Sequence, residues 1–204
     1  MRLHFTAALV TAIILTGCDP QTKQEHQSAQ AVPAGDVAII DSNTVELKTS
    51  TGKTILLTET HPNGRSLVTL KAEAVGFGSS ATLTLEDIDP ITGIKKTDLD
   101  GNGFEEIYIF TTAAGSGSYG MVHAILSLGD TALTTVSLPA PEPNDELFRG
   151  YMGHDIFMIQ EKVITRTFPV FKEGDSNASP TGGSRIIEYE LENENGAWSI
   201  RVAE

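Results

Sequence analysis

Hydrophobic and polar residues alternate over short stretches along most of this chain. Leu67 to Val75 and Ala81 to Leu85 alternate with a period of two, which is typical of a strand that buries one face. Other short apolar runs occupy residues 37–40, 44–47, 53–58, 106–112, 121–128, 132–138, 155–160, 163–168, 185–192 and 197–202. No stretch has the spacing of a long amphipathic helix. The pattern therefore predicts about ten short strands.

Turn-forming residues separate these runs. Asn195-Gly196 lies between the last two and predicts a tight hairpin, and Glu161-Lys162 predicts another. Residues 139–145 carry three prolines and form a connector, followed by one expected helical turn at 146–148, whereas residues 174–184 form a long polar loop. We expect a single all-β domain over residues 36–204, folded as an antiparallel β-sandwich.

The N-terminus has the order of features of an export signal. Arg2 precedes an apolar stretch from Ala7 to Leu15, which is too short to span a bilayer comfortably. Leu15-Thr16-Gly17-Cys18 then resembles the lipobox of bacterial lipoproteins. This resemblance implies a signal peptide over residues 1–17, lipidation of Cys18 and a flexible polar tether over residues 18–35. The alternative is an ordinary secretory peptide with an incidental cysteine.

Composition narrows the classes of partner. The chain has a formal net charge of −13, which disfavours nucleic acid and favours a basic protein or a cation, although solubility explains the charge equally well. Cys18 is the only cysteine. Once it is acylated, no thiol remains for a disulfide, a metal site or a nucleophile. The lipoprotein resemblance implies attachment to a membrane of the bacterial cell envelope, facing the periplasm; the oligomeric state is not predicted.

An acidic turn offers oxygen ligands at alternate positions. Asp98, Asp100, Asn102 and Glu106 surround two glycines, and the carbonyl of Phe104 adds a further oxygen. Calcium prefers such a set, which resembles the calcium loops of EF-hands and integrin-type repeats. The twelfth position is Ile109 instead of the EF-hand glutamate. The alternative is a β-turn in which the same side chains accept hydrogen bonds from the backbone.

A glycine- and serine-rich loop follows the strand expected at 106–112. Residues Gly115 to Gly120 match G-x-G-x-x-G, the pattern of a dinucleotide-binding turn, but the region after them is too short for the required helix and no βαβ pattern occurs. The loop also lacks the G-x-S-x-G of a nucleophile elbow. His123 and His154 have no acid at an informative spacing. We therefore expect no enzymatic activity.

The same loop has the composition of a binding element. Its glycines allow a narrow tip, Ser116 and Ser118 supply hydroxyl groups, and Tyr119 supplies a rigid amphipathic ring of the kind found at interface hot spots. The alternative is a plain hairpin tip with Tyr119 packed back onto the sheet.

Ser116-Gly117-Ser118-Tyr119 resembles the Ser-Gly-x-Tyr motif of the bacterial periplasmic inhibitors of invertebrate-type (i-type) lysozymes. The preceding acidic turn and apolar strand are also similar, and the resemblance covers residues 67–138. It implies a β-sandwich whose loop enters the lysozyme cleft, with Ser116 bonded to a catalytic acid and Tyr119 beside it. Lysozyme is then the expected partner. The alternative is a structural or ligand-binding envelope lipoprotein with calcium at residues 98–106.

Overall fold

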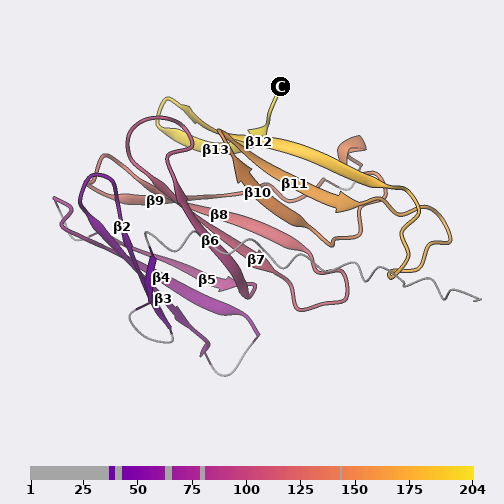
Figure 1. The fold of residues 1–204 in the computed structure, drawn as a ribbon, viewed down its shortest axis with the longest axis horizontal. Helices are drawn as coiled ribbons and strands as arrows, with labels where there is room; N and C mark the ends of the chain where they lie inside the picture. Colours follow the sequence, from indigo (N-terminus) through magenta and orange to yellow (C-terminus); the bar gives the residue numbers. More distant parts are fainter. Residues whose placement is uncertain (1–36, 40–42, 63–65, 79–80, 143) are drawn as a thin grey trace, which may run out of the picture.

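Three antiparallel sheets, each built from consecutive strands, lie in layers (Figure 1). The computed structural model describes residues 37–39, 43–62, 66–78, 81–142 and 144–204. The expected signal peptide (1–17), the lipidation site Cys18 and the tether (18–35) lie outside these residues. Within the described ranges, no helix is long and apolar enough to cross a membrane.

Strand order follows chain order in every sheet. The first sheet contains β1 (Val37–Ile39), β2 (Thr44–Lys48), β3 (Thr54–Thr60), β4 (Val68–Val75) and β5 (Ala81–Ile88). The middle sheet contains β6 (Ile91–Thr97), β7 (Glu106–Thr112), β8 (Gly120–Ser127) and β9 (Leu133–Ser137). The third sheet contains β10 (Ile156–Gln160), β11 (Val163–Pro169), β12 (Ser184–Glu194) and β13 (Ala197–Val202).

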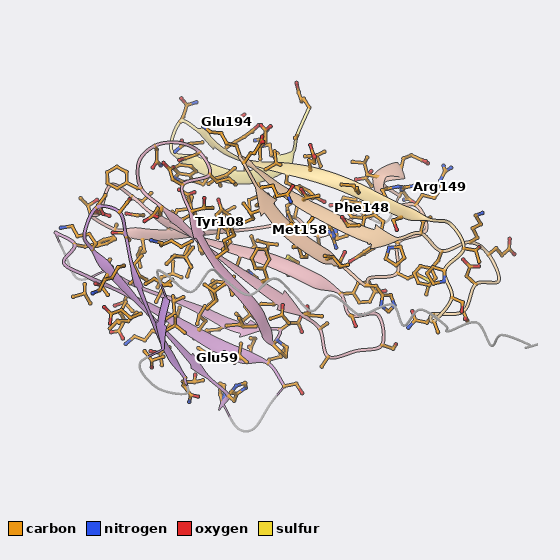
Figure 2. All side chains as sticks on the ribbon, in the orientation of Figure 1. Glu59, Tyr108, Phe148, Arg149, Met158 and Glu194 are labelled. Carbon is orange, nitrogen blue, oxygen red and sulfur yellow. The ribbon has the colours of Figure 1, made fainter. Side chains whose placement is uncertain are left out.

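The middle sheet is covered on both faces. Ile107 and Ile109 of β7 pack with the first sheet, in a core that includes Leu47, Leu57 and Leu70. The alternate residue Tyr108 points to the other side, into the core shared with the third sheet (Figure 2). Successive side chains on a strand point to opposite faces, so β7 contributes to both cores and reads as a continuous apolar run.

The expected all-β antiparallel sandwich is confirmed, with a third layer added. The strand β6 was not anticipated, because its sequence carries a glycine and two adjacent lysines. Lys95 and Lys96 point to opposite faces of the middle sheet. Lys95 Nζ donates to the carbonyl of Ile159 in the third sheet, 2.6 Å away, and Lys96 Nζ donates to the carbonyl of Lys48 in the first sheet. One strand thus ties the middle layer to both outer layers.

The expected turns are confirmed where turn chemistry was clear. Asn195 and Gly196 both have positive φ, as a two-residue hairpin between β12 and β13 requires. Glu161, between β10 and β11, also has a positive φ. The helical turn is the 3-10 helix η2 (Glu146–Phe148), whose first turn is capped by the Asp145 carboxylate accepting from the Leu147 N–H.

Candidate functional site

The Gly-Ser loop, residues 113–119, joins β7 to β8. The Ala113 N–H donates to the Tyr119 carbonyl at 2.8 Å and closes the two ends of the loop. At the tip, the Ser118 N–H donates to the Gly115 carbonyl. Ser118 has a φ of +44°, so the tip turns through a left-handed residue. The loop connects two antiparallel strands, whereas a dinucleotide-binding turn leads into a helix. This segment therefore does not have the strand–turn–helix geometry of a dinucleotide-binding site.

A second segment, residues 150–155, runs against the loop. The His154 N–H donates to the Gly117 carbonyl at 2.6 Å. Gly153 lies so close that a Cβ there would be 2.0 Å from the same carbonyl oxygen, and its φ is +88°. Only glycine meets both requirements. Contact between Gly117 and Gly153 therefore sets how far the loop stands from the body of the protein.

The long polar loop before β12 supplies a third contact. Asn177 Nδ2 donates to the Ser116 carbonyl at 2.7 Å, while its Oδ1 lies 3.0 Å from His154 Nε2. The His154 ring in turn stacks on Phe171, with centroids 6.0 Å apart. Asn177 thus links the Gly-Ser loop to residues 150–155, which gives the otherwise unexplained 174–184 loop a structural role.

Asp155 anchors the C-terminal end of the loop, where β8 begins. Its Oδ2 accepts from the N–H of Gly120, the first residue of β8, at 2.7 Å and from the Tyr151 hydroxyl at 2.6 Å. Its Oδ1 accepts from Arg166 Nε at 2.8 Å. Burial raises the pKa of the Tyr151 hydroxyl, and the hydrogen bond to Asp155 raises it further. Tyr151 therefore remains a donor at all physiological pH values.

Aromatic rings surround the guanidinium of Arg166. Its Cζ lies 4.8 Å from the ring centre of Tyr151, 5.1 Å from Phe148 and 5.5 Å from Phe157. Burial alone would lower the pKa of Arg166, but the hydrogen bond and charge of Asp155 hold it above the ordinary arginine value. The cation is thus satisfied by hydrogen bonds to the Asp155 carboxylate and by aromatic rings around it.

The outer side of the Gly-Ser loop remains accessible. Tyr119 is 48% exposed, yet its ring packs edge-to-face with that of Tyr151, with centroids 5.6 Å apart. Tyr119 thus has features of both expected arrangements: part of its ring faces solvent, as in a binding element, and part packs on the protein, as in a plain hairpin tip. Ser116 is exposed and Ser118 half-buried, and neither hydroxyl has a hydrogen-bond partner among the described residues. The loop therefore presents two free hydroxyl groups and half of an aromatic ring.

The acidic turn lies at the other end of β7. Asp98 accepts from the N–H groups of Gly101, Asn102 and Gly103, and Asp100 accepts from the Asn102 N–H and side-chain amide. Asn102 Oδ1 accepts from the Phe104 N–H. These are the local bonds expected of a polar β-turn. The seven residues of β7 separate this turn from the Gly-Ser loop by roughly 20 Å.

Glu106 joins this turn from inside the protein. Its side chain is buried, and Oε2 accepts from the Leu99 N–H at 2.7 Å and from the Tyr108 hydroxyl at 3.3 Å. Burial, with the charges of Asp100 and Asp98 adding to it, raises the pKa of Glu106 to about 7. One carboxylate oxygen from each of these three acids lies within 4.8 Å of the others. A cation held here would have Asp98, Asp100 and Glu106 as ligands.

The two histidines considered as bases are placed separately. His123 Nδ1 lies 2.7 Å from the hydroxyl of Ser137, its cross-strand neighbour on β9, and burial lowers its pKa. His154 belongs to the segment that supports the Gly-Ser loop. Each ring therefore has a structural contact.

Sequence reasoning found the Ser116–Tyr119 loop but missed what holds it. Gly153, His154, Asp155 and Asn177 are between 35 and 61 residues away from the loop positions that they contact. The available signal was the pair of glycines in Gly150-Tyr-Met-Gly153, which is unusual directly before a strand.

Comparison of the chain with protein-family models, with curated proteins and with solved structures finds no match.

Proposed function

We propose that this chain is a protein-binding module that inhibits a lysozyme, of the invertebrate type, by inserting the Ser116–Tyr119 loop into the active-site cleft. The observation that carries the proposal is the combination of a fixed backbone with free side-chain groups. Asn177, His154 and Asp155 bind the loop and its end at three points, while the Ser116 and Ser118 hydroxyls have no partner within the part of the chain that the structure describes. A loop already held in one conformation loses little entropy on binding.

The chemistry of the loop suits a glycosidase cleft. Lysozymes work with a pair of carboxylic side chains, and a carboxylate accepts hydrogen bonds from hydroxyl groups. Ser116 would donate to one of these acids, and Tyr119 would cover the apolar wall beside it. The net charge of −13 would attract a cationic lysozyme over long range. The resemblance of Ser116-Gly117-Ser118-Tyr119 to the i-type inhibitors supports the same conclusion.

The test is a cell-wall lysis assay. The chain from Asp19 onward keeps every described residue, and it would be titrated against i-type, c-type and g-type lysozymes. Stoichiometric inhibition of one class is expected, and the double variant Ser116→Ala with Tyr119→Ala should lose it. Full inhibition by that variant, or silence against all three classes, would contradict the proposal.

A second candidate function is a calcium-dependent structural or ligand-binding module. The specific observation in its favour is the approach of Glu106, a buried acid, to Asp98 and Asp100. Carboxylate oxygens at this spacing are the ligands that calcium takes. Under this proposal the Gly-Ser loop is only a turn.

Lipidation at Cys18 would place either module at a membrane surface of the cell envelope. Labelling of the full chain with a radioactive fatty acid should modify the wild type and leave Cys18→Ala unlabelled. Equal labelling of both would contradict lipidation at this residue.

A further inference from the structure

Two exposed apolar residues, Tyr119 and Met152, belong to the Gly-Ser loop and to residues 150–155, which run against it. They are two of the eight large hydrophobic residues that are strongly exposed in the described chain. Large apolar side chains concentrated on one part of a surface often mark a protein interface.

Met152 is the member of this group that adjoins the loop itself. Its carbonyl oxygen would lie 3.1 Å from a Cβ added at Gly117, and the ring of Tyr119 borders the same glycine. Met152 is 42% exposed and Tyr119 48% exposed, so each keeps a substantial face free. Gly117 therefore lies beside the ring of Tyr119 and the backbone of Met152, two half-exposed residues from different segments.

The position of Met152 relative to the loop is fixed. The next residue, Gly153, abuts the Gly117 carbonyl without room for a side chain, and His154 donates to that carbonyl. One residue further, Asp155 is buried and bonded to Gly120. A partner whose cleft receives Ser116 to Tyr119 therefore comes close to Met152, which is exposed and held beside the loop by its backbone.

We propose that Met152 is a second anchor of the lysozyme interface, packing on the rim of the substrate cleft while the loop fills it. This inference rests on the proposed function. Ligand clefts are lined mainly by apolar and aromatic side chains, which a thioether side chain can follow closely. Tyr119 supplies a rigid contact and Met152 an adaptable one.

The test measures affinity by titration calorimetry against the lysozyme class that the wild-type chain inhibits. Met152→Ala should weaken binding about tenfold, the usual loss for a buried interface anchor. Met152→Leu keeps the volume and should restore most of the affinity. Val75→Ala is the matched control, because Val75 is 52% exposed but lies on β4 of the first sheet.

Amide resonances distinguish the loss of a direct Met152 contact with the lysozyme from a change in the conformation of the Gly-Ser loop. The amide resonances of Gly117 and His154 should be unchanged in Met152→Ala. Wild-type affinity in Met152→Ala, together with weakened binding in Tyr119→Ala, would overturn the role of Met152 and leave the proposed function intact. No binding of the wild-type chain to i-type, c-type or g-type lysozyme would overturn both.

Discussion

Asp155 and Arg166 form an ion pair from which water is almost fully excluded, with their side chains 0% and 2% exposed. The pair connects the start of β10 with the middle of β11, and the same carboxylate holds Gly120 at the end of the Gly-Ser loop. A buried charge is costly unless it is paired and hydrogen-bonded, and here every close partner is a donor or an aromatic face.

Removal of one member of this pair should be more harmful than removal of both. Asp155→Ala leaves the Arg166 charge buried without a counter-ion, and should lower the free energy of unfolding by about 3–5 kcal/mol. The double variant Asp155→Leu with Arg166→Met has no charge to bury and should be more stable than Asp155→Ala. Urea denaturation of the single and double variants measures this. Additive losses would contradict the account.

Gly153 and Gly174 make a matched pair for testing the contact between the loop and its support. Both have a φ of +88°, but only Gly153 lacks space for a Cβ. Gly174→Ala should cost about 1 kcal/mol of stability from backbone strain alone. Gly153→Ala should cost clearly more and shift the amide resonance of Gly117, since the Gly117 carbonyl must move. Equal melting temperatures for the two variants would argue against the contact.

The stability of the protein should depend on pH through Glu106. Burial raises its pKa from 4.5 to about 7, so the folded chain binds this proton more tightly than the unfolded chain does. The stabilisation is complete below about pH 4.5 and is lost as the pH rises through about 7. In chelator, wild-type stability should fall over that window by at most about 1.4 kcal/mol per pH unit, the effect of one proton.

Glu106→Gln cannot lose a proton and is the control for this effect. The groups that face Glu106 are Asp98, Asp100 and the Tyr108 hydroxyl. None of them is altered in the variant, so the difference between the two pH profiles isolates Glu106. Parallel profiles from pH 4 to pH 8 would show that Glu106 titrates normally.

If calcium binds the acidic turn, its stabilising effect should increase as the pH rises, whereas the stability of the calcium-free protein should fall. A cation requires the ionised form of Glu106, so binding should strengthen as the pH rises through about 7. Millimolar calcium should then raise the Tm more at pH 8 than at pH 6, and Asp98→Asn with Asp100→Asn should abolish the rise. A Tm that does not respond to calcium or chelator at either pH would remove the second candidate function.

The fold was predictable where each strand or turn has its own local pattern. The hairpin at Asn195-Gly196 and the alternating strand β4 follow from neighbouring residues alone. The third layer was not foreseen, although Ile107 to Phe110 forms a continuous apolar run of the kind that a sheet buried on both faces requires. The strand β6 was missed because Lys95 uses its long side chain to reach a carbonyl of another sheet.

The candidate site was predictable only in its exposed part. Ser116 and Tyr119 stand in a short motif that local composition reveals. Asp155 and Asn177 act on the loop from distant parts of the chain, and nothing in their local sequence marks them. Long-range hydrogen bonds depend on how the sheets pack, which the order of residues does not show.

The layered order of the sheets has a consequence for how the chain folds as it emerges. Each layer is a meander of consecutive strands, so strand pairing is local within each layer. The layers also stack in chain order. The first sheet buries its apolar face against the middle sheet, and the middle sheet buries its other face against the third. A chain that stops before β10 would leave the Tyr108 face of the middle sheet bare and prone to aggregate. Folding should therefore proceed from one end to the other, and the Gly-Ser loop acquires its supports only when the last layer closes.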